Sequence, residues 1–193
     1  MSTIRIPASI FSALMALALM LSGCAGPWES VPHTINTASW SIRPPEGWMD
    51  LRTGDSDMLS KDGPFLEYIL VESRSLKQGF RFTRQKITPQ MLPLEVAELI
   101  IDSMRADPII RRFRLISSDP AILGGHGGFK LTYRYEDQNG VDIKAVYYGV
   151  VLGNMFFNLR YTATRRYYFD SQLAAFKRVV DSLRFAPAAG PAS

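Results

Sequence analysis

Three segments in the second half of the chain have the strongest β-strand pattern, and the first and third alternate between two sets of side chains with a period of two. They span residues 129–136, 141–152 and 155–163. Asn139-Gly140 and Gly153-Asn154 separate them at hairpin spacing. The middle segment is apolar on both faces for much of its length, as expected of a central strand covered on both sides. The pattern therefore predicts a three-stranded antiparallel meander.

Two other stretches repeat apolar residues at spacings of three and four, the period of an amphipathic helix. The first opens near Pro93, which suits a first helical turn, and ends at Asp107, because the residue before a proline avoids the helical region. The second runs to Leu183, and its start is open between Thr164 and Asp170, since either can cap a helix. The apolar stripes are Leu94, Ala97, Ile101 and Met104, then Phe169, Leu173, Phe176, Val180 and Leu183.

Shorter strands are predicted earlier in the chain, bounded by turns that contain proline and glycine. We expect them at residues 40–42, 48–51, 57–60 and 65–73, and another at 112–117; residues 79–88 indicate a loop with an irregular strand. Four glycines surround His126 and predict a turn. A chain of 193 residues is expected to form one domain once a leader is removed. We place this α+β domain at residues 40–185, followed by a disordered tail at 186–193 that is rich in Pro, Ala and Gly.

The first residues have the layout of a signal peptide: Arg5, then an uncharged apolar run from Ile10 to Leu21. The run is short for a transmembrane helix, which needs about 20 apolar residues. Its end, Leu21-Ser22-Gly23-Cys24, resembles the bacterial lipobox at every position. We expect residues 1–23 to be a signal peptide, cleaved between Gly23 and Cys24. An ordinary secretory signal with a chance cysteine and an uncleaved membrane anchor are the alternatives.

The lipobox resemblance implies that Cys24 carries a thioether-linked diacylglycerol and an N-acyl chain such as palmitate. Two or more acyl chains anchor a protein stably. Cys24 is also the only cysteine, so its lipidation leaves no thiol for a disulfide, a metal or a nucleophile. Residues 24–39 are rich in proline and small polar residues and are predicted to be a flexible tether. In Gram-negative lipoproteins the next residue, here Ala25, influences sorting, and the absence of Asp implies the outer membrane, facing the periplasm.

The charge balance adds little to this assignment. The formal net charge is +4, and it includes Arg5, which leaves with the signal peptide. A balance this mildly basic gives no reason to expect nucleic acid as a partner. The partners implied are the membrane, through Cys24, and an envelope protein.

The order of elements resembles a known superfamily. The segment from Trp40 to Trp48, a long helix, a Gly-Gly turn, an antiparallel meander and a last helix ending in Asp181-Ser182-Leu183-Arg184-Phe185 are similar to PsbP/Mog proteins, including the DcrB-type bacterial lipoproteins. The resemblance implies a central antiparallel β-sheet sandwiched by helices, the PsbP-like α/β/α sandwich. It also implies a non-catalytic binding or assembly role, since known members are mostly binding and assembly factors.

No reaction is indicated by the residues themselves. The glycines around His126 vaguely resemble an esterase oxyanion loop, but the Gly-x-Ser-x-Gly elbow is absent, and a hairpin turn explains them better. His33 falls in the predicted tether, so the two histidines are not expected to pair on a metal. Asp55-Ser56-Asp57 and Glu136-Asp137 lack the rest of a calcium loop. We therefore expect no metal and no cofactor, and leave open an envelope hydrolase whose carboxylates pair only in the fold.

A cationic surface is the one candidate binding site. Its expected members lie on the strand at 112–117 and on the polar faces of the meander: Arg112, Arg114, Lys130, Arg134 and Arg160. If these strands are neighbours, the patch suits anionic headgroups or an acidic protein partner. The alternative is a solvated sheet face interspersed with Glu136 and partly covered by a helix. An exposed apolar or basic patch would favour a binding module, and a deep pocket lined by acids with raised pKa would favour an enzyme.

Overall fold

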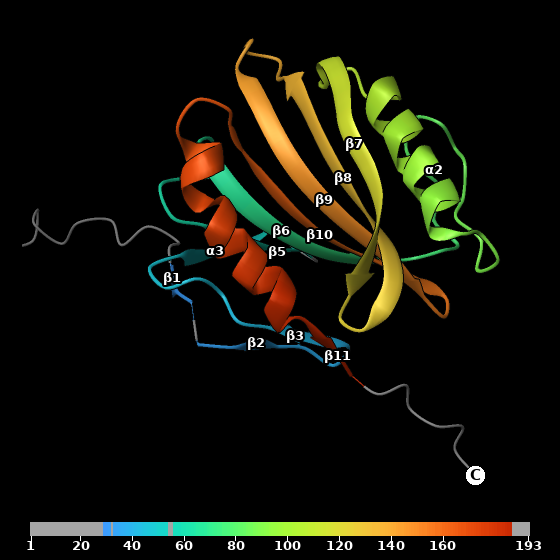
Figure 1. The fold of residues 1–193 in the computed structure, drawn as a ribbon, viewed down its shortest axis with the longest axis horizontal. Helices are drawn as coiled ribbons and strands as arrows, with labels where there is room; N and C mark the ends of the chain where they lie inside the picture. The colour runs from blue at the N-terminus through green and yellow to red at the C-terminus, as the bar shows by residue number, and fades with distance from the viewer. Residues whose placement is uncertain (1–28, 32, 54–55, 187–193) are drawn as a thin grey trace, which may run out of the picture.

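The structure is a computed structural model that describes residues 29–31, 33–53 and 56–186. Its main element is an eight-stranded antiparallel sheet in the order β1-β4-β5-β6-β10-β9-β8-β7. Figure 1 shows this sheet strongly curved, with α3 and α2 over different parts of it. The strands are β1 (Glu29–Ser30), β4 (Met49–Thr53), β5 (Ser56–Ser60), β6 (Glu67–Ser75), β7 (Arg111–Leu123), β8 (His126–Glu136), β9 (Asp142–Leu152) and β10 (Met155–Thr164).

A second, three-stranded sheet pairs the last described strand with two strands near the start of the chain. It has the order β11-β3-β2, formed by Arg184–Phe185, Trp40–Ile42 and Ile35–Asn36. Trp40 and Phe157 make an edge-to-face contact with ring centroids 5.9 Å apart, which fixes this small sheet against β10. The domain therefore begins before Trp40: β1 and β2 lie within the stretch predicted to be a tether, and Ile35 belongs to the core.

One face of the large sheet packs against α3 (Tyr168–Ser182) and the small sheet. We call it the α3 face. Its core contains the odd-numbered residues of β10 from Phe157 to Ala163 and the apolar stripe of α3, where Phe169, Phe176, Val180 and Leu183 are buried as predicted. Neither Thr164 nor Asp170 caps this helix. The Tyr161 hydroxyl instead donates to the Tyr168 carbonyl oxygen at 2.7 Å, so a bond from β10 marks the start of α3.

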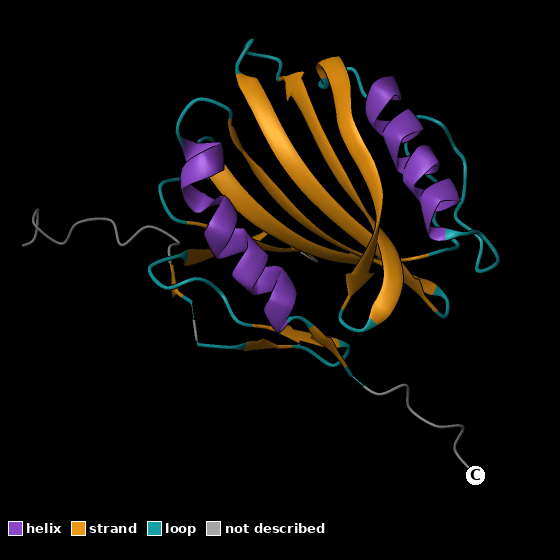
Figure 2. Ribbon diagram, viewed as in Figure 1, coloured by secondary structure: helices purple, strands orange, loops and turns teal. Residues whose placement is uncertain are grey.

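The opposite face packs against α2 (Pro93–Ala106) and the loop that precedes it, and we call it the α2 face. Val96, Ala97, Ile100 and Ile101 of the helix are buried against aromatic residues of β8 and β9. At the helix start, the Leu92 amide donates to Glu95 Oε2 at 2.7 Å, which satisfies one of the free N–H groups there. Helices on both faces of an antiparallel sheet make the α/β/α sandwich that the sequence predicted (Figure 2).

The meander is confirmed with ends within a few residues of the prediction. Strand β7 is longer than predicted, because it continues through Pro120 to Leu123. Proline is tolerated there since β7 is the last strand of the sheet and needs no donor on its outer side. The glycine-rich segment divides: Gly124 and Gly125 form the two-residue hairpin turn with φ of 56° and 87°, whereas Gly127 and Gly128 lie within β8. Residues 79–88 contain no strand.

Candidate binding surfaces

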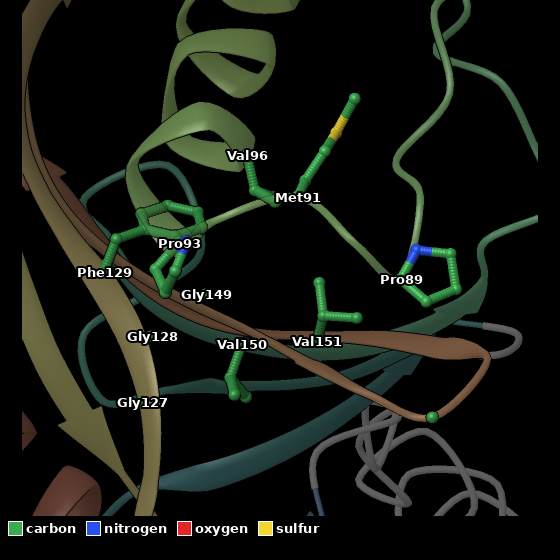
Figure 3. A pocket seen from close by; sticks show the side chains of 11 residues that line it. Pro89, Met91, Pro93, Val96, Gly127, Gly128, Phe129, Gly149, Val150 and Val151 are labelled. Atoms are coloured by element: carbon green, nitrogen blue, oxygen red, sulfur yellow. The ribbon is translucent and has the colours of Figure 1, made fainter.

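An apolar pocket of about 310 Å³ lies between the start of α2 and the paired strands β8 and β9. Figure 3 shows Pro89, Met91 and Pro93 on the helix side of it and Val150 and Val151 on the sheet side. The remaining lining residues are Val96, Gly127, Gly128, Phe129, Gly149 and Gly153. No titratable side chain lines this pocket, so it is suited to apolar contact rather than to acid–base chemistry.

A second hollow of about 540 Å³ continues the pocket toward the tip of the β7–β8 hairpin and shares Pro93, Gly127 and Gly128 with it. It is lined by Leu92, Leu94, Pro120, Ala121 and Ile122 as well. Three of these side chains are strongly exposed for their type, with Ile122 at 70%, Leu92 at 66% and Leu94 at 42%. We call the two hollows together the α2–hairpin groove. Exposed apolar side chains gathered in this way are typical of an interaction site.

The floor of the groove depends on glycines in neighbouring strands. A Cβ atom on Gly128 would lie 2.3 Å from the carbonyl oxygen of Gly149, and one on Gly149 would lie 2.4 Å from Cζ of Phe129. Sequence reasoning assigned the glycines near His126 to a turn and did not find the groove. Its signal would have been two glycines inside a strand pattern, which often mark a close approach of backbone or ligand.

The predicted cationic surface forms in part. Arg114, Lys130 and Arg134 share the α3 face, because β7 and β8 pair Arg114 with Arg134 and Asp119 with Lys130. Arg112 lies at the same end of the β7–β8 pair as Arg114 and Arg134. It donates to Glu136 Oε1 at 2.7 Å, and 74% of its side chain is exposed. Acids are therefore interspersed among these cations, and an exposed ion pair of this kind contributes about 0–1 kcal/mol.

Arg160 does not belong to that surface. It pairs with Tyr147 on β9 and with Leu70 on β6, and Tyr147 belongs to the core on the α2 face. The prediction that Arg160 gathers with Lys130 and Arg134 is therefore wrong. Polar positions of β8 point to the α3 face, whereas polar positions of β10 point to the α2 face, because the odd-numbered residues of both strands are apolar but face opposite ways.

Two carboxylates, Glu67 and Asp137, stabilise turns by accepting backbone hydrogen bonds. Glu67 Oε1 accepts hydrogen bonds from the amides of Lys61 and Asp62 at 2.9 and 2.8 Å. Desolvation by burial raises the Glu67 pKa above its usual value, although these two bonds act in the lowering direction. Asp137 Oδ1 accepts from the amides of Asn139 and Val141, both at 2.8 Å, and stabilises the β8–β9 turn. These bonds give both carboxylates a structural role.

Other candidates for chemistry are dispersed in the described part of the chain. His126 contacts the Phe185 ring, with centroids 5.6 Å apart, at the edge of the small sheet. Within residues 29–31, 33–53 and 56–186, no group of three or more His, Cys, Asp and Glu could hold a metal ion. None of the helices that the structure describes is long and apolar enough to cross a membrane. Gly23, Cys24 and the tail at 187–193 lie outside the described residues.

Comparison with known proteins supports the fold and nothing finer. No protein-family model matches the chain, and no curated protein matches its sequence. Solved structures do match in fold. Cyanobacterial PsbP (CyanoP) from Synechocystis sp. PCC 6803 aligns with a TM-score of 0.58 and 14% identity over 86% of this chain and 99% of that one.

Two further solved structures have the same architecture. LpqN, involved in cell envelope biogenesis of Mycobacterium tuberculosis, aligns with a TM-score of 0.56 and 14% identity over 84% of this chain and all of that one. The Ran-binding protein Mog1p of Saccharomyces cerevisiae aligns with a TM-score of 0.54 and 9% identity over 81% and 96% of the two chains. The protein therefore has the α+β fold of the PsbP and Mog1 structures. Identity this low defines the fold class alone.

Proposed function

We propose that this protein is a lipid-anchored module of the bacterial envelope that binds a partner protein through the α2–hairpin groove and catalyses no reaction. The observation that carries the binding half is the exposure of Leu92, Leu94 and Ile122 around one continuous apolar groove. Isolated exposed apolar residues are ordinary on a protein surface, but a contiguous group favours an interface. The names of two fold neighbours are compatible with such a role: one is a Ran-binding protein, and the other is involved in cell envelope biogenesis.

The anchoring half of the proposal rests on Leu21-Ser22-Gly23-Cys24. The two acyl chains of the thioether-linked diacylglycerol and the N-acyl chain would hold the protein at the membrane, since each buried methylene contributes about 0.8 kcal/mol. The absence of Asp after Cys24 favours the outer membrane, with the domain facing the periplasm. The cations Arg112, Arg114, Lys130 and Arg134 lie on the other face of the sheet from α2 and are a secondary surface for an acidic partner.

Replacing Cys24 by serine should abolish incorporation of radiolabelled palmitate and leave the precursor unprocessed, because a serine hydroxyl cannot form the thioether. Labelling and gel mobility of the two chains measure this directly. Ser22→Ala, which keeps a small residue before the cysteine, is the matched control and should label normally. Palmitate incorporation that is unchanged in Cys24→Ser would exclude the lipoprotein assignment.

A photo-crosslinking residue at Ile122 should capture a single partner in intact cells, because that side chain is 70% exposed beside the groove. The same probe at Asn139, in the β8–β9 turn, is the control and should capture none. Adding Leu94→Asp to the Ile122 probe should remove the product, since a charge in the groove opposes apolar contact. Equal products from both positions, or a product that survives Leu94→Asp, would contradict a role for the groove.

A further inference from the structure

Arg160 has an unusual environment for a charged side chain. It is only partly exposed and lies in the middle of β10, next to Tyr147 on one neighbouring strand and Leu70 on the other. No helix lies over this part of the α2 face in the way that α2 lies over β7, β8 and β9. A buried charge is normally paired, because removing it from water is costly. None of the ion pairs in the described part of the chain includes Arg160.

Tyrosines surround the guanidinium group. Its Cζ lies 5.7 Å from the centroid of the Tyr68 ring, and the fully buried Tyr133 interacts with it electrostatically. Tyr135 and Tyr147 are close enough to interact with it electrostatically. Burial raises the pKa of Tyr133 to about 12 and raises the pKa values of Tyr135 and Tyr147 as well. These hydroxyls therefore stay protonated at neutral pH, so they cannot neutralise the guanidinium and remain available as hydrogen-bond donors.

Three polar atoms of one strand face lack a partner here. Arg160 Nε, Asn158 Oδ1 and Thr162 Oγ1 are all buried without a hydrogen bond. Asn158 and Thr162 are 3% and 4% exposed, and they point to the same face as Arg160 because they are two residues away from it on β10. The Asn158 amide nitrogen does donate to Glu72 Oε2 at 3.2 Å, so the carboxylate of Glu72 already has a hydrogen-bond partner. Arg160 Nε and the Thr162 hydroxyl can donate to an acceptor group of a ligand, which would remove the cost of leaving them unpaired, whereas Asn158 Oδ1 can only accept.

A small pocket adjoins these polar groups. It has a volume of about 110 Å³ and is lined by Tyr68, Tyr135 and Thr162, together with residues of the β5–β6 turn and of β9. That is far more than the ~15 Å³ that a single water molecule needs. The lining includes Glu67 and Asp137, but both of these carboxylates accept backbone hydrogen bonds in turns. Arg160 does not itself line the pocket, but Tyr68 and Thr162 do, and both neighbour Arg160: Tyr68 through its ring and Thr162 two residues along β10.

From this arrangement we propose that Arg160, with Thr162 and the hydroxyls of Tyr68 and Tyr135, forms a binding site for a single carboxylate group. Guanidinium Nε and one Nη lie side by side and match the two oxygens of a carboxylate. A single guanidinium among tyrosine hydroxyls, with Glu67, Glu72 and Asp137 nearby, suits a singly charged group better than a phosphate dianion. The carboxylate belongs either to a small organic acid or to an acidic side chain of a bound protein. The site does not depend on Cys24 or on the α2–hairpin groove.

Acetate added to the full chain in detergent should shift the backbone amide NMR signals of residues 158–162 in a saturable way. Arg160→Lys keeps the charge but loses the planar fork, so it should weaken binding at least several-fold. The matched control, Arg134→Lys, changes a cation on the opposite face of the sheet and should leave the titration unchanged. A capped peptide with one glutamate distinguishes the two sources: tighter binding than acetate indicates a protein side chain, and weaker binding indicates a small acid.

Thr162→Val separates binding from folding. It removes a buried hydroxyl that has no partner and keeps the shape, so the free energy of unfolding should stay the same or rise, while acetate affinity should fall several-fold. Three results would each overturn the site: signals that do not move with acetate, signals that move equally with sodium chloride, or an affinity that is the same in Arg160→Lys and wild type. None of these results bears on palmitate labelling or on crosslinking from Ile122.

Discussion

Replacing Gly128 by alanine is expected to lower the free energy of unfolding by about 3 kcal/mol, at the upper end of what overpacking usually costs. The new Cβ would lie 2.3 Å from the Gly149 carbonyl oxygen and 3.2 Å from Cβ of Val150. The first of these atoms belongs to the backbone of β9, so it cannot move without disturbing the pairing of β8 with β9. For a domain of this size we expect the Tm to fall by roughly 6–12 °C, measured by thermal unfolding.

Gly127→Ala is the matched control for that experiment. It is the preceding residue of the same strand, but its Cβ would meet no atom within 4 Å and its φ is not positive. We expect a change in unfolding free energy of about 0.5 kcal/mol or less, in either direction. Similar losses for the two variants would mean that glycine is needed at this hairpin for another reason than the close approach of Gly128 to β9.

Replacing Phe176 by alanine should cost about 3–5 kcal/mol, the range for a buried phenylalanine. Its side chain is fully buried in the middle of α3 and contacts the rings of Tyr161 and Tyr148, with centroids 5.4 and 6.0 Å away. Denaturant unfolding should show a lower midpoint with an unchanged slope, because the whole α3 face is one core.

The neighbouring Lys177 provides the control for Phe176. It is exposed on the next position of the helix, so Lys177→Ala should change the unfolding free energy by no more than about 0.5 kcal/mol. A loss below about 1 kcal/mol in Phe176→Ala would mean that α3 is not packed on the sheet as described.

The period of the apolar residues predicted the strands and helices that bury one regular face. The meander and both helices followed from it because their apolar residues recur with the period of the element. The start of α3 did not follow, since a hydrogen bond from Tyr161, eight residues earlier than Phe169, marks it in place of a local cap. The second half of β7 was missed because Pro120 is normally a sign against a strand, and only its position at the sheet edge permits it.

The sequence pattern does not show on which face of the sheet the apolar side chains of β10 lie. In β8 the odd-numbered residues Phe129 and Leu131 face α2, whereas in β10 the odd-numbered residues Phe157 and Leu159 face α3. The strand between them, β9, is apolar on both sides, so its pattern does not relate the facing of one neighbour to that of the other. The register of β9 with β8 and with β10 gives this relation. It places Arg160 on the α2 face, away from the cations with which the sequence pattern grouped it.

The small sheet has a consequence for how the domain meets its surroundings. Because β1 pairs with β4 at one edge of the large sheet, whereas β11 pairs with β3 in the small sheet, the described chain enters and leaves the fold through different sheets. A load applied through the N-terminal segment would act first on the two-residue pairing of β1 with β4, and only then on the small sheet that retains Phe185 and Ala186. Anything fused after residue 186 would start beside the small sheet and not beside β1.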